Sequence, residues 1–175
     1  VPLRLENDGD VTALAGAIAL DDGAVLGLAM GSSLAGGYVD GERKIKGWMN
    51  ELAFAPVDLN PKAAVDEWSL DRGVGANYFS QQAVARLIPA AGIDMPDIPE
   101  EALPDRLKRV QELMLSGDER ARNIYETIGS YFGYTVAHFC DFYRPVRHIE
   151  VLGRVMSGEG GQIILSGARQ VLEDE

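Results

Sequence analysis

Two neighbouring side chains near the start of the sequence have the chemistry of a group-transfer site. Asn7 and Asp8 directly precede a helical pattern. A carboxylate at such a junction can take a proton from a hydroxyl nucleophile, while the adjacent amide holds the substrate. The alternative is that Asp8 or Asp10 only caps the helix, because acidic side chains accept hydrogen bonds from the first free N–H groups. The pair therefore indicates either a general base or an N-cap.

A second candidate is the segment 31–37 (GSSLAGG), in which only Leu34 is larger than serine. Small residues allow backbone N–H groups to turn toward an anion, as they do in phosphate-binding loops. The segment lacks the Gly-Lys-Ser/Thr ending of a Walker A loop. A strand is expected after it, which excludes the dinucleotide-binding fingerprint, since that motif opens a helix. A plain glycine-rich β-turn is the other interpretation.

A third candidate, Gly153-Arg154, directly follows an alternating apolar segment at residues 146–152. Ligands of open α/β sheets bind at the carboxyl ends of strands, so this position favours a ligand contact. His138 and Cys140 are two residues apart on an expected helix and point in different directions, which argues against a metal site. His148 lies within the expected strand and is interpreted as structural.

The elements that must position these groups follow from hydrophobic periodicity and turn residues. We expect helices over residues 10–20, 77–91, 103–115, 118–143 and 161–172, and strands over 24–30, 38–39, 42–45 and 146–152. Residues 58–75 are expected to form a long loop. Gly129 and Gly133 would let another backbone approach the fourth helix, within the chain or in a homodimer. Strands mixed with helices in this order predict an α/β fold with a mixed sheet and flanking helices.

Composition and charge narrow the classes of function. The chain has 175 residues, 16 Lys and Arg against 27 Asp and Glu, and a net charge of −11. Nucleic-acid binders present a basic surface to phosphates, so direct binding of nucleic acid by this chain is not expected. The single cysteine, Cys140, cannot form an intrachain disulfide, which points to a reducing, cytoplasmic location. No apolar run approaches the roughly 20 residues of a membrane span, so no membrane partner is expected.

Taken in order, these segments resemble the ROK family of bacterial sugar kinases and sugar-responsive regulators. Residues 6–8 (END) resemble the family's E-N-D-A-N segment, and residues 31–41 resemble its G-T-G-I-G-G-G loop and hairpin. Residues 47–54 (GWMNELAF) are similar to the sugar-binding stretch G-x-x-G-E-I-G-H. Residues 128–145 and 152–155 resemble the long helix, the proline and the G-G-V turn near the adenosine.

The resemblance implies a role for each matching residue. Asp8 would be the catalytic base, and the acceptor, a sugar-like small molecule, would be held by Asn7, Asn50 and Glu51. ATP would be contacted by Gly31, Ser32, Ser33, Gly36, Gly153 and Arg154. Magnesium would be bound through ATP, with no metal held by the chain itself.

The family architecture implies that residues 1–175 form one lobe of a two-lobe protein. This would be the larger, C-terminal lobe of an actin/hexokinase-like, RNase H-like ATPase, and its partner lobe with the D-I-G-G-T phosphate loop would lie upstream of Val1. The implied activity is ATP-dependent phosphotransfer to a sugar or polyol hydroxyl in the full-length protein, with the single lobe inactive alone. The alternative is a non-enzymatic, sugar-sensing domain of a transcriptional regulator.

Two departures from the family pattern concern the sugar and zinc sites. Phe54 stands where the family has a histidine, and Ala76 stands where it has a second sugar-binding glutamate. Residues 69–76 contain none of the zinc-binding cysteines, so structural zinc, which needs about four ligands, is not expected. Polar residues that could replace the lost sugar contacts are Asp66, Glu67, Asp71 and Asn77.

Overall fold

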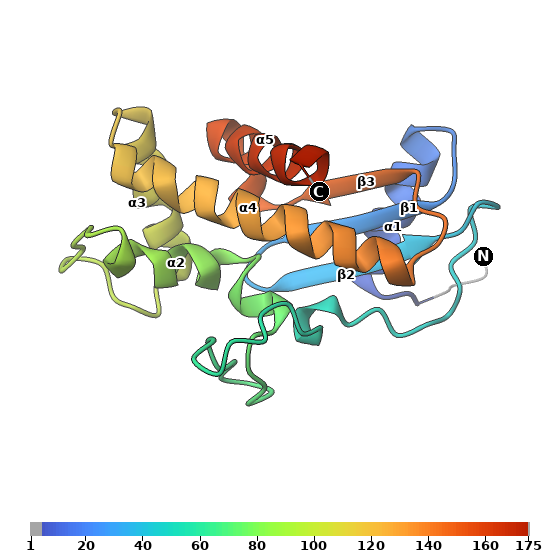
Figure 1. Cartoon of the computed structure of the whole chain (residues 1–175), viewed down its shortest axis with the longest axis horizontal. Helices are drawn as coiled ribbons and strands as arrows, with labels where there is room; N and C mark the ends of the chain where they lie inside the picture. Colours follow the sequence, from blue (N-terminus) through green and yellow to red (C-terminus); the bar gives the residue numbers. More distant parts are fainter. Residues whose placement is uncertain (1–4, 175) are drawn as a thin grey trace.

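A three-stranded mixed sheet lies at the centre of residues 5–174, the part of the chain that the computed structural model describes (Figure 1). The strands are β1 (Val25–Met30), β2 (Leu34–Val39) and β3 (His148–Leu152), in the order β2-β1-β3. The helices are α1 (Asp8–Ala19), α2 (Gln81–Ala90), α3 (Leu103–Leu115), α4 (Glu119–Phe142) and α5 (Gly158–Asp174). Residues 5–174 also contain three short 3-10 helices, η1 (Leu52–Phe54), η2 (Gly75–Asn77) and η3 (Arg154–Met156). The expected α/β class is confirmed.

The central strand β1 pairs differently with its two neighbours. It runs antiparallel to β2, with Met30 opposite Leu34 beside the turn, and parallel to β3, with Ala29 opposite Leu152. Parallel strands need a crossover connection, which the long segment containing α2, α3 and α4 supplies. Consequently the turn after β1 and the end of β3 meet at the same edge of the sheet.

Helices cover both faces of the sheet. Residues alternate between the two faces of β1: Leu26, Leu28 and Met30 belong to the large core that includes the apolar sides of α4 and α5, whereas Val25 packs with α1. In Figure 1, α4 and α5 lie over one face of the sheet and α1 lies behind the other. Burial of β1 from both sides explains its continuous apolar sequence.

Helix α1 approaches the sheet so closely that its backbone touches the strands. A Cβ atom added to Gly37 in β2 would lie 2.2 Å from the backbone N of Asp10, and one added to Gly27 in β1 would lie 2.5 Å from the N of Ala13. Gly27 and Gly37 are paired across the two strands and so form one flat contact surface. Only glycine permits this approach, because any side chain would occupy the space of the helix backbone.

Helix α5 covers the two glycines of α4 that the sequence marked as a close-approach surface. A Cβ on Gly129 would lie 2.9 Å from the carbonyl oxygen of Ile164, and one on Gly133 would lie 2.6 Å from Cβ of Val171. Of the two uses considered for this face, the structure shows packing within the chain. Homodimer formation stays a prediction.

Two sequence predictions around β2 were wrong. Leu34–Val39 is a strand, although residues 31–37 were expected to be a loop. Gly37 of this strand allows the backbone of α1 to approach closely and does not form a turn. Residues 42–45 were expected to form a strand, but only an isolated bridge between Val39 and Ile45 occurs there. The Asp40 carboxylate accepts hydrogen bonds from the backbone N–H groups of Glu42 and Lys44, at 2.8 and 2.9 Å, which holds this segment as a turn.

The remaining elements agree with the expected ones apart from their ends. Helix α3 has the expected bounds, α1 begins two residues earlier at Asp8, and α5 extends over Gly158–Asp174. The long loop 58–75 is confirmed, and two isolated bridges, Pro56 with Val74 and Val65 with Arg72, fold it back on itself. None of the helices within residues 5–174 combines the length and hydropathy needed to cross a bilayer.

The contact between α1 and β2 predicts that Gly37→Ala destabilises the protein, because the new methyl group would overlap the backbone of Gly9 and Asp10. The expected loss in the free energy of unfolding is about 1–3 kcal/mol, the range for overpacking, measured by urea denaturation. Gly41→Ala is the matched control, since nothing lies within 4 Å of its added Cβ. Equal stability of the two variants would contradict the close approach.

Candidate functional site

The structure gathers most of the predicted site residues around one cavity. This cavity, called here the site cavity, has a volume of about 810 Å³ and lies where α1 begins, β1 turns into β2, and residues 50–54 and 66–68 pass by. Nine of the ten candidates line it: Asn7, Asp8, Gly31, Ser32, Ser33, Gly36, Asn50, Glu51 and Gly153. The tenth, Arg154, is exposed and does not line it.

The N-terminus of α1 presents Asp8 to this cavity. Asn7 is the N-cap, and its Oδ1 accepts from the backbone N of Gly9 at 2.9 Å. Oδ1 of Asp8 accepts from the same N–H, also at 2.9 Å, and the side chain is exposed. Asn7 is thus the N-cap, and Asp8 shares the same N–H, whereas Asp10 accepts from Tyr38 and Asn50 instead of capping the helix. The second carboxylate oxygen of Asp8 has no hydrogen-bond partner among the described residues and can accept a proton from a ligand.

The turn between β1 and β2 leaves two backbone amides open. The Gly31 N–H donates to the carbonyl oxygen of Ser33 at 2.9 Å, and the Gly31 carbonyl accepts from the N of Gln81 at 2.9 Å. The Gly31 amide is thus already hydrogen-bonded within the turn and is not free to bind an anion. Within residues 5–174 the amides of Ser32 and Ser33 have no acceptor, and both residues are exposed at the cavity.

A buried hydrogen-bond network fixes the segment that carries Glu51. Asp10, which is 3% exposed, accepts from Nδ2 of Asn50 at 2.8 Å and from the backbone N of Tyr38 at 3.3 Å. The hydroxyl of Tyr143 donates to Oδ1 of Asn50 at 2.9 Å. Burial, aided by the nearby charge of Asp10, raises the pKa of Tyr143, so the hydroxyl keeps its proton. Asn50 therefore links α1 to the end of α4.

Glu51, next to Asn50, reaches the first candidate pair. Nδ2 of Asn7 donates to Oε1 of Glu51 at 3.5 Å, a long hydrogen bond between two exposed side chains. The two residues are 44 positions apart in sequence, and the fixed Asn50 brings them together. Asn7, Asp8 and Glu51 consequently form one polar wall of the site cavity.

Another part of the lining contains residues that the sequence did not select as site residues. Trp68 and Gln82 line the cavity together with Asp66 and Glu67, which the sequence suggested only as replacements. The Trp68 ring stacks on Phe54 with ring centroids 6.3 Å apart and an interplanar angle of 15°. Asp71 does not line the cavity. The fold-back of the long loop, through the bridges described above, places Asp66, Glu67 and Trp68 here, whereas Gln82 comes from α2.

Gly153 contributes to the cavity through a close backbone approach. It has a φ of 109°, and an added Cβ would lie 2.3 Å from the carbonyl oxygen of Met30. The end of β3 therefore lies directly against the end of β1, beside the turn at Ser32. No group of three or more His, Cys, Asp or Glu side chains within the described residues is arranged to hold a metal ion.

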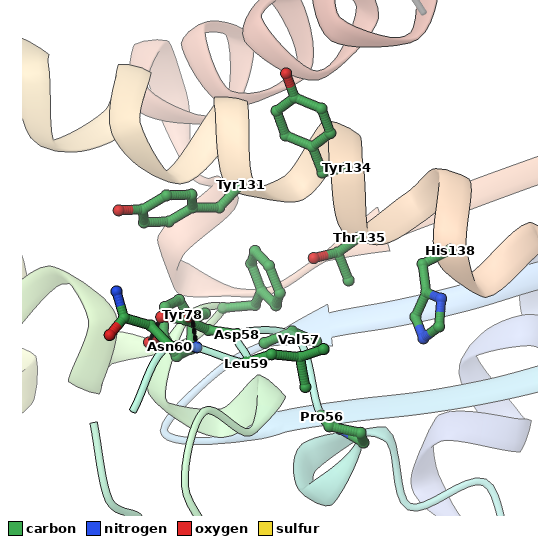
Figure 2. A pocket seen from close by; sticks show the side chains of 11 residues that line it. Pro56, Val57, Asp58, Leu59, Asn60, Tyr78, Tyr131, Tyr134, Thr135 and His138 are labelled. Atoms are coloured by element: carbon green, nitrogen blue, oxygen red, sulfur yellow. Dashed lines mark hydrogen bonds between the residues drawn. The ribbon is translucent and has the colours of Figure 1, made fainter. Parts of the chain in front are cut away.

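A second cavity, of about 580 Å³, lies between the loop at residues 56–60 and one side of α4 (Figure 2). In Figure 2, Tyr131, Tyr134, Thr135 and His138 come from α4. The Tyr78 hydroxyl donates to the Asp58 carboxylate at 2.5 Å. This hydrogen bond lowers the pKa of Asp58, while burial raises the pKa of Tyr78. None of the predicted site residues lines this second cavity.

Comparisons with solved structures find the same fold in ROK proteins. A ROK hexokinase from Thermus thermophilus has a TM-score of 0.75 at 21% identity. The match covers 99% of this chain and 57% of the hexokinase chain. A ROK glucokinase from Streptomyces griseus, in complex with glucose and AMPPNP, has a TM-score of 0.74 at 18% identity. A ROK transcriptional regulator, a homologue of the E. coli MLC protein, has a TM-score of 0.75 at 19% identity, with 44% of its chain covered.

These likenesses confirm the predicted resemblance at the level of the fold. The chain spans about half the length of the solved structures it matches, which include both kinases and a regulator. Searches against protein-family models and against curated proteins found no match. The geometry of the cavity, rather than sequence identity, must therefore carry the functional argument.

The Asp10–Asn50–Tyr143 network predicts a specific loss of stability in Tyr143→Phe. The substitution removes the donor to Oδ1 of Asn50 inside the protein, which costs about 1–3 kcal/mol of the free energy of unfolding. Tyr134→Phe is the control, because this tyrosine is 57% exposed and makes no hydrogen bond among the described residues. Denaturation curves should separate the two variants, and coincident curves would argue against the network.

Proposed function

We propose that the chain is the larger lobe of a ROK-type sugar kinase, which transfers the terminal phosphoryl group of ATP to a hydroxyl of a sugar or polyol. One observation carries the proposal: the Asp8 carboxylate and the open amides of Ser32 and Ser33 line the same cavity. Phosphoryl transfer needs a base for the attacking hydroxyl and donors for the charge on the transferred group. Asp8 supplies the first and the turn supplies the second.

The proposed reaction is an in-line displacement in which the protein mostly positions the reactants. The acceptor hydroxyl gives its proton to the free oxygen of Asp8, and its oxygen forms a bond to the terminal phosphorus of ATP. The bond from this phosphorus to the bridging oxygen breaks, and ADP leaves. Asn7 and Glu51, joined by their hydrogen bond, hold other hydroxyls of the acceptor. Asn50, whose amide is committed to Asp10 and Tyr143, positions Glu51.

Nucleotide binding is proposed for the edge where β1 and β3 end. Gly36 and Gly153 line the cavity, and the exposed Arg154, which follows Gly153, would contact the adenosine. Magnesium, carried by the ATP phosphates, would offset their negative charge. The preceding lobe would close the other side of the cavity, so the 175 residues alone are expected to be inactive. That the chain spans about half the length of the ROK structures it matches supports this arrangement.

A sugar-sensing domain of a transcriptional regulator is the second candidate. The Mlc-like regulator has the same fold over 99% of this chain. Phe54 and Ala76 line the cavity where the resemblance expects a histidine and a glutamate, so two polar contacts are replaced by apolar side chains. A sensor would bind the sugar without phosphorylating it.

The kinase proposal predicts that Asp8→Asn in the full-length protein lowers kcat by about 10²–10⁴, the usual contribution of a positioned general base. Asparagine has nearly the same shape but cannot accept the proton, so KM for ATP should change little. Phosphotransfer is measured by ADP release over a panel of sugars and polyols.

Asp94→Asn provides the matched control, because Asp94 is exposed and lies outside the site cavity. It should keep the parent rate. An Asp8→Asn variant that also keeps the parent rate would contradict the base assignment. Sugar binding without ADP release from the parent protein would favour the sensor.

A further inference from the structure

The side chains around the site cavity are strongly unbalanced in charge. Asp8, Glu51, Asp66 and Glu67 line it, and none of its lining residues is a lysine or an arginine. Carboxylates gathered in a cleft focus a negative potential, which raises the local concentration of cations and repels anions. A neutral sugar would use only the hydrogen-bonding capacity of these groups, whereas a cationic ligand would also use their charge.

The aromatic pair Phe54 and Trp68, which lines the same cavity, also favours a cation. Trp68 is 87% exposed although its ring stacks on Phe54, so one indole face is open. The electron-rich face of tryptophan attracts ammonium groups more strongly than other aromatic side chains do. Among the described residues, a cation–π contact occurs between Arg86 and Tyr78, with the guanidinium 4.9 Å from the ring centroid, and not at Trp68. No cation of the described chain therefore occupies the open face of Trp68.

The local structure holds the carboxylate and the indole next to each other. Oδ2 of Asp66 accepts from the backbone N of Trp68 at 3.1 Å and from that of Ser69 at 2.8 Å, and Asp66 is 4% exposed. These bonds fix the Asp66 carboxylate at the base of the Trp68 side chain. Glu67, between them, is exposed at the cavity. A carboxylate and an aromatic face side by side are a common way to bind an ammonium group.

From these two observations we propose that the acceptor carries a protonated amine, as in an amino sugar or an aminopolyol. Its ammonium group lies against Trp68 and the Asp66–Glu67 carboxylates, and its reacting hydroxyl lies at Asp8. This inference rests on the proposed function, because it names the acceptor of the same site. It gives a role to Trp68, which the reaction itself does not use.

The test compares three sugars of similar size in the full-length protein: glucosamine, glucose and N-acetylglucosamine. Binding is measured by titration calorimetry at mildly acidic pH, where the amine of glucosamine is protonated. Glucosamine is expected to bind at least about tenfold more tightly than either neutral sugar. The difference should shrink at high salt, since exposed charges are screened.

Substitutions at Trp68 and Glu67 test the proposed ammonium contacts directly. Trp68→Ala and Glu67→Gln should each reduce glucosamine affinity about three- to tenfold more than they reduce glucose affinity. Both side chains are exposed, so the fold should be retained. Trp48→Phe and Glu100→Gln are the controls, because neither residue lines the cavity, and both should keep the full preference.

The outcomes separate this inference from the proposed function. If neutral sugars bind as tightly as glucosamine and are phosphorylated in an Asp8-dependent reaction, the amine inference is overturned and the kinase proposal stands. A glucosamine preference that survives unchanged in both variants also overturns the role of Trp68 and Glu67. If no sugar binds and no ADP is released, the proposed function fails and this inference fails with it.

Discussion

The direct contact between the backbone of α1 and the glycines of β1 and β2 is the constraint on which the site depends. Gly27 and Gly37, paired across the strands, leave no side chain between helix and sheet. The helix can therefore start beside β2, which places Asp8 at the edge where β1 turns into β2. A larger residue at either glycine would push the helix outward and move the carboxylate away from the turn.

A second constraint is the buried Asp10, which joins parts of the chain that are distant in sequence. Through Asn50 it connects α1 with the end of α4, 93 residues further along from Asn50. A carboxylate in this environment must be hydrogen-bonded, since an unpaired buried charge is very unfavourable. The network therefore supports the position of Glu51 without taking part in chemistry. Asn50 thus provides structural support, while the adjacent Glu51 provides the proposed ligand contact.

Local sequence patterns predict the helices of this chain well but fail around β2. Periodicity predicted the bounds of α3 and the existence of the other helices, because apolar stripes report burial directly. The same reasoning failed for Leu34–Gly37, because glycines that usually indicate a turn here serve a close helix contact. It also failed for residues 42–45, where the Asp40 carboxylate binds the backbone N–H groups that a strand would need. Both failures arise from interactions that periodicity does not describe.

The sequence by itself determined the α/β class, the order of most elements and the candidates Asp8 and Ser32-Ser33, because these depend on residue types at short spacing. The tertiary structure decided that these candidates share a cavity, that the Gly31 amide is already hydrogen-bonded, and that Asn50 has a supporting role. It also decided that Asp66 and Trp68 form part of the wall, through the fold-back of a loop with no periodic pattern. Such long-range contacts arise from packing and hydrogen bonding between distant segments, which no local window of sequence contains.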